Sequence, residues 1–374
     1  MIQYKGIVRN IDSPVVGLVT RNALSVLRGK SVLVSKINTF LANGFAGFIT
    51  IDNFQKTSSL PQVKVTIDIL DKLNEGDCVL IGKDGVVTVV WEKNAKMNPL
   101  LLTEMCDCRC MMCPQPPKPN NKKLLEICRR IIEIVTVEDN QTICLTGGEP
   151  TLLRQELLGI FSLIRNKHPN SEVMLLTNGK SFSDFDFTRQ YVTSKPNILI
   201  TCVSLHSDVD EVHDKIVGVK NSFYKTIQGL HNLARFRELI ELRVVVSYQN
   251  ANHLESIANF IQRNFPFIYH CVFMGMEFTG NAIGNYNDIW IDPFEYRDQL
   301  SRAVRVLSRS DVSVSIYNLP LCLIDRISWR YARQSISGWK NNYLPVCDEC
   351  AVKSQCGGIF TTSGLHQSPH ICPQ

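Results

Sequence analysis

Four cysteines lie close together in the first third of the chain. Cys106, Cys110 and Cys113 follow the spacing C-x3-C-x2-C, and Cys108 lies between the first two of them. Three thiolates on one loop can hold three irons of a 4Fe–4S cluster, whereas full ligation needs four cysteines. The fourth iron would then be open to a substrate or cofactor. A zinc site or a group of reactive thiols remains the alternative.

A second group of cysteines lies near the end of the sequence. Cys347, Cys350 and Cys356 are spaced C-x2-C-x5-C, and Cys322 and Cys372 could complete a ligand set. Soft thiolates suit both iron–sulfur clusters and zinc, so an auxiliary cluster and a structural zinc knuckle both fit this pattern. We interpret the other five of the 14 cysteines as buried small hydrophobes. These are Cys78, Cys128, Cys144, Cys202 and Cys271.

A glycine-rich turn with an acidic residue follows the cysteine loop by about 35 residues. It contains Gly147, Gly148 and Glu149, in the segment LTGGEPTLL. Glycines let a backbone approach a ligand closely, and a carboxylate accepts hydrogen bonds from an ammonium group. Taken alone, the segment is also an ordinary turn between a strand and a helix. Its place one strand after the cysteine loop favours a shared binding site.

The elements that must position these residues alternate between strand and helix from about residue 98 to 310. We expect strands at 100–102, 143–145, 173–176, 198–203, 242–246 and 269–274, and helices at 122–135, 152–164 and 252–264. This alternation is typical of βαβ units and a parallel sheet. Six such strands predict an α/β fold with a partial (β/α)6 barrel, in which ligands gather at the C-terminal strand ends.

Polar residues close the later strands of this predicted barrel. Asn178 follows the third strand, Ser204 ends the fourth, Arg243 lies on the fifth, and Asn281 follows the sixth. An exposed or core-rim arginine is the alternative interpretation of Arg243. Because strand ends of one barrel face meet, we expect these side chains and the cysteine loop to share one site.

Two smaller regions flank the predicted barrel. Residues 1–95 contain short β-like runs and a hairpin, with strands at 79–81 and 86–91 and a turn at 82–85, which predicts a small α+β module. Residues 311–374 have weak periodicity and the second group of cysteines. We expect this cysteine-rich extension to be organised by metal rather than by a core of its own.

Composition and charge exclude several classes of protein. The chain is 44% hydrophobic and 20% charged, with a net charge of +5 and no dense block of Lys and Arg, so we expect no nucleic-acid binding. No apolar run reaches the roughly 18 residues that a membrane span needs. The first residues lack the features of a signal peptide, and a disulfide framework is not expected. We predict a cytoplasmic protein.

The C-x3-C-x2-C loop, the GGEP turn and the ordered strand ends resemble the radical S-adenosylmethionine (SAM) superfamily over residues 98–310. The resemblance implies that Cys106, Cys110 and Cys113 hold a 4Fe–4S cluster, that SAM chelates its open iron, and that SAM is cleaved to a 5′-deoxyadenosyl radical. It also implies that Gly147, Gly148 and Glu149 contact the SAM amino group. The remaining SAM contacts that we predict are Ser204 to the ribose, Arg243 to the carboxylate, and Asn178.

Resemblance to a narrower family rests on CMMCPQPP, LTGGEPTLL, VHDKIVG and the CDEC…SQCGG tail. These segments look like the C-type radical SAM maturase of His-Xaa-Ser peptide systems, in which Asn and a small polar residue are expected where this chain has Asp107 and Cys108. The tail is similar to twitch or shortened SPASM domains, which implies an auxiliary cluster on Cys322, Cys347, Cys350, Cys356 and Cys372. The implied partners are a precursor peptide, a second radical SAM maturase and a reductant protein.

Three hypotheses for function follow. The first is a radical SAM maturase that modifies a ribosomally made peptide and docks it, or the partner maturase, on residues 1–95. The second keeps the radical SAM enzyme but gives it a small-molecule substrate. The third is a non-catalytic protein that binds zinc or an iron–sulfur cluster, which leaves the ordered strand-end motifs without a role. No residue is predicted to act as a catalytic acid, base or radical carrier.

Overall fold

The computed structural model describes residues 2–25, 27–36, 44–54, 59–119, 121–310, 312–334, 341–363 and 366–374. Its contacts divide the chain into two compact units. The first comprises residues 1–102, 122–144 and 160–171, and the second comprises 103–121, 145–159 and 172–374. Each unit is described below by itself.

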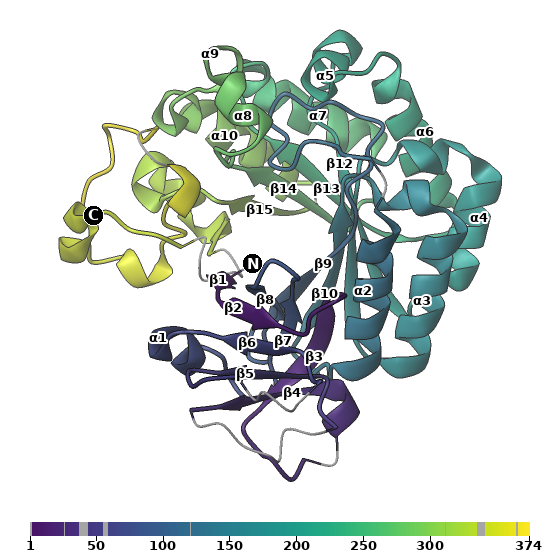
Figure 1. Cartoon of the computed structure of the whole chain (residues 1–374). Coiled ribbons are helices and arrows are strands. Elements are labelled where there is room, and N and C mark those ends of the chain that lie inside the picture. Colours follow the sequence, from purple (N-terminus) through teal and green to yellow (C-terminus); the bar gives the residue numbers. More distant parts are fainter. Residues whose placement is uncertain are drawn as a thin grey trace. The chain divides into compact units, whose positions relative to one another are not determined.

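The first unit contains a mixed sheet with the strand order β1-β8-β7-β3-β4-β5-β6-β2 (Figure 1). Its strands are β1 (Ile2–Lys5), β2 (Ile7–Arg9), β3 (Val15–Thr20), β4 (Ser31–Ser35), β5 (Gly47–Thr50), β6 (Gln62–Lys64), β7 (Cys78–Ile81) and β8 (Val86–Trp91). The predicted hairpin is confirmed, because β7 and β8 pair antiparallel across residues 82–85.

This sheet closes on itself through one glycine. β1 pairs with β8 at one end of the strand order and β2 pairs with β6 at the other, yet only Gly6 separates β1 from β2. Residues 2–9 therefore act as one bent strand that joins both ends of the sheet. A Cβ atom on Gly6 would lie 2.6 Å from the carbonyl oxygen of Lys64, so a side chain does not fit at the bend.

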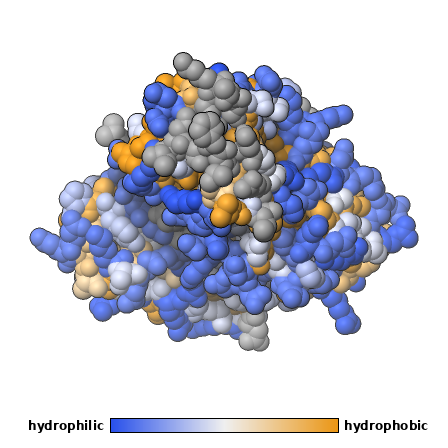
Figure 2. Space-filling model, turned by 60° about the horizontal axis from the view of Figure 1, so that its bottom comes forward, coloured by the Kyte–Doolittle hydropathy of each residue, from blue (hydrophilic) through white to orange (hydrophobic). Residues whose placement is uncertain are grey.

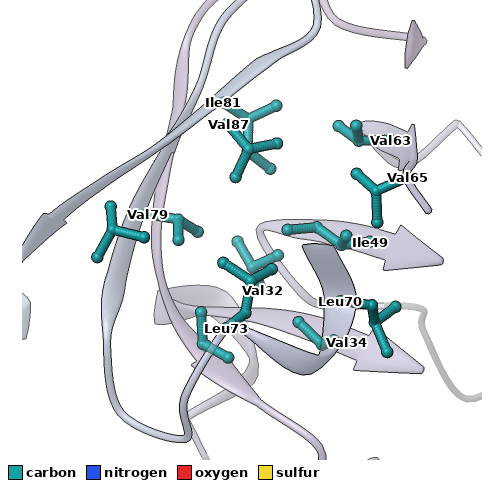
Figure 3. Packing of buried hydrophobic residues seen from close by; sticks show 12 residues of the cluster. Val32, Val34, Ile49, Val63, Val65, Leu70, Leu73, Val79, Ile81 and Val87 are labelled. Atoms are coloured by element: carbon teal, nitrogen blue, oxygen red, sulfur yellow. The ribbon is translucent and has the colours of Figure 1, made fainter. Parts of the chain in front are cut away.

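Alternate residues of these strands fill the closed sheet. Figure 3 shows Val32 and Val34 of β4, Ile49 of β5, and Val79 and Ile81 of β7 gathered in one core. The short helix α1 (Ile67–Asp71) adds Leu70 to this core, and Leu73 follows directly after it. The period of two along each strand is what places these side chains on one face.

The second sheet has the order β16-β15-β14-β13-β12-β11-β10-β9, and β11 to β16 pair in parallel. Its strands are β9 (Met97–Thr103), β10 (Thr142–Gly147), β11 (Glu172–Thr177), β12 (Ile198–Ser204), β13 (Leu239–Val245), β14 (His270–Met274), β15 (Ser313–Tyr317) and β16 (Ala332–Arg333). Helices connect most successive strands (Figure 1). They are α2 (Lys122–Ile134), α3 (Gln155–Lys167), α4 (Phe185–Ser194), α5 (Asp210–Val217), α6 (Ser222–Arg235), α7 (Leu254–Asn264), α8 (Asn281–Gly284), α9 (Tyr286–Ile289) and α10 (Pro293–Ser308).

The six predicted strands are all present, but the sheet is wider than predicted. β15 pairs with β14 and β16 pairs with β15, so the number of six strands was wrong and part of the cysteine-rich extension belongs to the sheet. In β15, Val314 and Ile316 are buried and alternate with Ser313 and Ser315. Five residues carry too little of this pattern to stand out in a sequence. Residue 311, where the extension was predicted to begin, lies outside the described residues.

After β16 the described tail is built from short 3-10 turns. They include Pro345–Glu349, Lys353–Gln355 and Thr361–Ser363, and an isolated antiparallel bridge joins Asn342 to Ile359. This is the kind of segment predicted from the weak periodicity.

In the described part of the chain, no helix is long and apolar enough to span a bilayer. Figure 2 shows a face on which hydrophilic residues predominate and apolar residues are scattered among them.

Candidate functional site

The cysteine loop follows β9 directly and brings three thiols together. Sγ of Cys108 accepts hydrogen bonds from the thiols of Cys106 and Cys110, which lowers the pKa of Cys108, and its N–H donates to Cys106 Sγ at 3.4 Å. Cys113 lies one turn later, and its thiol donates to the carbonyl of Gln115 at 3.0 Å. Sequence reasoning gave Cys108 no defined role, whereas the structure places it in the middle of the thiols.

One side of this loop is held by the end of α5. The N–H of Arg109 donates to the carbonyl of Val217 at 2.9 Å, and the N–H of Met111 donates to that of Ile216 at 2.9 Å. Gly218 has a φ of +69°, and a Cβ atom there would lie 2.6 Å from the carbonyl oxygen of Arg109. The VHDKIVG segment therefore supports the loop through its backbone.

The other side of the loop is held by α8. Asn281 binds it twice: its side-chain amide donates to the carbonyl of Cys110 at 3.0 Å, and its backbone N–H donates to that of Cys113 at 2.9 Å. Asn285 donates to the carbonyl of Met111 at 2.9 Å. The prediction that Asn281 shares a site with the cysteine loop is confirmed, in a role that orients the loop.

The GGEP turn lies against the start of the same loop. The N–H of Gly148 donates to the carbonyl of Thr103 at 2.8 Å, and the N–H of Glu149 donates to that of Met105 at 2.6 Å. A Cβ atom on Gly147 would lie 2.5 Å from the Thr103 carbonyl oxygen, and one on Gly148 would overlap that of Met105. The two glycines thus allow the two backbones to meet.

Glu149 is fully buried and joins the ends of β10 and β11. Its Oε1 accepts from the Thr151 N–H at 3.0 Å, the Thr151 hydroxyl at 2.7 Å and the Thr177 hydroxyl at 2.8 Å. Its Oε2 accepts from the N–H of Asn178 at 2.6 Å. Burial raises the pKa of Glu149, and these hydrogen bonds oppose the shift. Oε2 retains capacity for a further donor, since a carboxylate oxygen accepts more than one hydrogen bond.

Asn178, Asp107 and Lys180 lie close together beside the thiols. Sequence reasoning gave Asp107 and Lys180 no role. The side-chain amide of Asn178 donates to Asp107 Oδ1 at 2.8 Å and to Cys108 Sγ at 3.4 Å. Lys180 Nζ lies 2.9 Å from Asp107 Oδ2. No local signal indicates this contact, because Lys180 is 73 positions away from Asp107.

Ser204 and Arg243 are neighbours across the β12–β13 pair. Arg243 Nε donates to Glu241 Oε1 at 2.6 Å, Glu241 Oε2 lies 2.9 Å from His270 Nδ1, and His270 Nε2 lies 3.0 Å from Ser315 Oγ. Burial favours a raised pKa for Glu241, but the bonds from His270 and the charge of Arg243 lower it overall. Arg243 is thus oriented by a buried network that the sequence did not reveal.

Two histidines after β12 form a buried pair. The N–H of His206 donates to Nδ1 of His213 at 3.1 Å, and the rings stack 5.8 Å apart. Burial lowers the pKa of His206 to about 3 and that of His213 to about 4. Both rings are neutral at physiological pH, which leaves His213 Nδ1 as an acceptor that fixes the start of the following loop.

The five tail cysteines line a single cavity, so the structure brings together the set that the sequence proposed. They are Cys322, Cys347, Cys350, Cys356 and Cys372. The sulfur of buried Cys356 accepts from the N–H groups of Leu321 at 3.3 Å and Gly358 at 3.4 Å. N–H donors of this kind stabilise thiolates and tune bound clusters.

The most compact group of potential metal ligands in the described residues lies in the cysteine loop. A tetrahedral zinc with Zn–S bonds of about 2.3 Å holds its sulfurs roughly 3.8 Å apart. Among the described residues, the group with three potential ligand atoms within 4.8 Å of one another is Cys106, Asp107 and Cys108, and no three tail cysteines meet that limit.

A second cavity lies at the C-terminal ends of three strands. Its lining includes Val246, Gly275 and Asn318, which directly follow β13, β14 and β15. Pro320, Ile359 and Ile371 line both this cavity and the tail cysteine cavity. Phe278, also in its lining, packs in one apolar cluster with Met112 of the cysteine loop. This cavity thus adjoins the tail cysteine cavity, and Phe278 links it to the apolar cluster that contains Met112.

Comparison with known proteins finds a family model that matches the part of the chain with the first of these sites. Residues 100–261 match the family model of the radical SAM superfamily. The chain is 25% identical over 200 residues to an Fe-coproporphyrin III synthase of Methanosarcina barkeri, covering 52% of this chain and 46% of that protein. It is 24% identical over 174 residues to a cysteine-type anaerobic sulfatase-maturating enzyme of Clostridium novyi, covering 42% and 45%. The chain thus spans about half the length of these relatives.

Two solved structures match part of the chain. One is Streptococcus suis SuiB bound to S-adenosylmethionine, with 14% identity and a TM-score of 0.48 over 60% of this chain and 51% of that one. The other is native anSMEcpe with bound AdoMet and Cp18Cys peptide, with 17% identity and a TM-score of 0.46 over 58% and 62%.

Enzymes of this family use a 4Fe–4S cluster and SAM. The donors of the cysteine loop fit such a cluster, because thiolates are its ligands and the loop presents several thiols side by side. Its backbone is also held on both sides, by α5 and by α8. The segment from residue 100 to residue 261, which contains the cysteine loop and the GGEP turn, therefore resembles the radical SAM enzymes.

Proposed function

We propose that the chain is a radical SAM maturase that modifies a ribosomally made peptide of the His-Xaa-Ser repeat type. The observation that carries the proposal is the cysteine loop, fixed by backbone contacts from α5 and α8 inside a segment that matches the superfamily. When bound, the cluster supplies an electron that cleaves SAM to a 5′-deoxyadenosyl radical. The protein binds, orients and shields the reactants.

Ligand roles follow from the chemistry of each side chain. Cys106, Cys110 and Cys113 are the proposed cluster ligands, as their spacing predicts. Glu149 is the proposed acceptor for the SAM amino group, since its Oε2 retains acceptor capacity beside the Asn178 N–H. Arg243, oriented by buried Glu241, is a donor for the SAM carboxylate.

The remaining proposed SAM contacts come from strand and turn ends. Ser204, at the end of β12, is the proposed ribose contact. Gly147 and Gly148 keep the turn close to the loop. Asn178 orients the loop at Asp107 and Cys108.

For the tail we propose an auxiliary iron–sulfur cluster of the twitch or SPASM type. Five cysteines line one cavity, which is enough for full ligation by four with one to spare. The N–H donors to Cys356 suit a sulfur that ligates such a cluster. The cavity at the C-terminal ends of β13, β14 and β15 is the proposed position of the substrate residue.

Replacing Cys356 with alanine should remove iron from the tail alone. We expect about half of the bound iron to be lost if both clusters contain four irons, because Cys356 is the most buried sulfur of the cavity. The electron paramagnetic resonance (EPR) signal of the catalytic cluster should still respond to SAM. Iron analysis and EPR make the measurement, with Cys78→Ala, a buried thiol of β7, as the control. Unchanged iron would identify Cys356 as the spare thiol of the five, whereas one zinc per chain in the wild-type tail would count against the auxiliary cluster.

The closed sheet of residues 2–91 is proposed to dock the precursor peptide or a partner maturase. Deleting it is a poor test, because α2 packs on β3 within the same unit and Arg130 donates to the carbonyl of Gly29 at 3.2 Å. We instead expect a His-Xaa-Ser peptide with a photoreactive group to cross-link to residues 1–95, as mapped by mass spectrometry. A scrambled peptide is the control. Cross-links confined to residues 98–374 would reject this role.

A small-molecule substrate is the second candidate, and one comparison favours it. One relative is named an Fe-coproporphyrin III synthase, whereas the other is named a sulfatase-maturating enzyme and supports a peptide substrate. The two candidates differ in what stimulates SAM cleavage.

The deciding experiment uses anaerobically purified protein, reconstituted with iron and sulfide and reduced, with 5′-deoxyadenosine as the readout. Stimulation by a His-Xaa-Ser peptide supports the maturase, and stimulation by a porphyrin alone supports the second candidate. Protein that binds only zinc and forms no 5′-deoxyadenosine would support a binding protein without catalysis. We propose a cytoplasmic location, where a reductant protein can supply the electron.

A further inference from the structure

Lys180 is a nearly buried ammonium directed at the cysteine loop. It follows Gly179, whose φ of +79° turns the chain after β11. Only 7% of its side chain is exposed. Its Nζ donates to the carbonyl oxygen of Asp107 at 3.1 Å and lies 2.9 Å from Asp107 Oδ2. One ammonium thus binds both the backbone and the side chain of the residue between Cys106 and Cys108.

Asp107 is held from a second direction as well. Its Oδ1 accepts from the side-chain amide of Asn178 at 2.8 Å, and the N–H of Asn178 donates to Glu149 Oε2 at 2.6 Å. A continuous set of polar contacts therefore links the GGEP turn to the first residue inside the cysteine loop. Both carboxylate oxygens of Asp107 have a partner on the β11 end of the sheet.

The stability of the fold gives little reason for the Lys180–Asp107 ion pair. Removing an ammonium from water is costly, and the attraction of one carboxylate roughly offsets that cost. The charges matter more for what lies beside them. A cluster bound by thiolates is anionic, and its reduction potential depends on nearby charge and on solvent exposure. Asp107 adds a negative charge at this point and Lys180 cancels it.

We propose that Lys180 and Asp107 form a positioning pair that orients the start of the cysteine loop and keeps the charge beside the catalytic cluster neutral. The proposal rests on the proposed function, because it assumes a 4Fe–4S cluster on Cys106, Cys110 and Cys113. Neither residue touches the reacting atoms. Their effect is exerted through the loop and through the electrostatic potential at the cluster.

The pair is tested by measuring the reduction potential of the cluster, which the two single variants should shift in opposite directions. Lys180→Met leaves an uncompensated carboxylate, which disfavours the added electron, so we expect a more negative midpoint potential. Asp107→Asn leaves an uncompensated ammonium, and the potential should become more positive. The double variant should return close to the wild-type value. The measurement is a redox titration followed by EPR, with Arg189→Met, which removes the exposed Arg189–Asp186 pair of α4, as the control.

Two results would overturn the inference. If both single variants lose iron but the loaded fraction keeps the wild-type potential, the pair is only structural. If both shift the potential in the same direction, charge compensation is wrong. If the wild-type protein assembles no 4Fe–4S cluster, the proposed function and the inference are both contradicted. If the wild-type protein has the cluster but the variants keep its midpoint potential, only the inference is contradicted.

Discussion

Replacing Cys113 with alanine is expected to remove the catalytic cluster and reduce 5′-deoxyadenosine formation to the background of the assay. With Cys113 lost, two of the three proposed ligands remain, and a 4Fe–4S cluster with two thiolates is not retained. Cys113 has a fixed place in the loop, because its carbonyl accepts from the N–H of Asn281 at 2.9 Å. Iron content, the EPR spectrum of the reduced protein and 5′-deoxyadenosine are measured on the same sample.

Two cysteine variants control this experiment. Cys271→Ala changes a buried thiol of β14 outside both groups of cysteines, and should keep the cluster at a cost of about 1 kcal/mol in stability. Cys108→Ala should also keep the cluster, although Cys108 contacts both Cys106 and Cys110. If Cys108→Ala loses the cluster while Cys106→Ala retains it, the ligand assignment from the C-x3-C-x2-C spacing is wrong.

The alternating core of the second sheet could be predicted because each element carries its own pattern. β11, β12 and β14 are apolar runs followed by turn residues, and their bounds agree with the prediction to within a residue or two. β15 and the closure of the first sheet could not be predicted. Closure depends on two pairings, of β1 with β8 and of β2 with β6. Residues 2–9 alone do not reveal that β6 and β8 belong to one sheet.

The candidate site likewise has a part that the sequence predicts and a part that it does not. The order of the motifs at the strand ends predicted that Asn178 and Asn281 lie at the cysteine loop. The structure shows a hydrogen bond from each of these side chains to the loop. The partners that fix them are contacts over long sequence separations. Lys180 meets Asp107 and Glu241 meets His270 only after the sheet has formed. The sequence shows which charged residues are present, but not which of them pair in the folded chain.

Glu149→Ala is expected to destabilise the second unit by about 3–5 kcal/mol, as well as to abolish SAM binding. The variant leaves the buried N–H groups of Thr151 and Asn178 without their acceptor, and each unsatisfied buried group costs about 1–3 kcal/mol. Denaturant unfolding followed by circular dichroism measures the loss. Glu255→Ala, which breaks a half-exposed pair with Arg302, is the control and should cost less than about 1 kcal/mol.

Glu149→Gln sharpens the same prediction, because it keeps the shape of the side chain and changes one acceptor into a donor. If the amide nitrogen replaces Oε2, it faces the N–H of Asn178, and if it replaces Oε1, it faces the N–H of Thr151. Either orientation brings two donors together, so we expect a loss of about 1–3 kcal/mol. A Glu149→Gln variant as stable as the wild type would show that the carboxylate does not accept these bonds. The GGEP turn would then depend on its glycines alone.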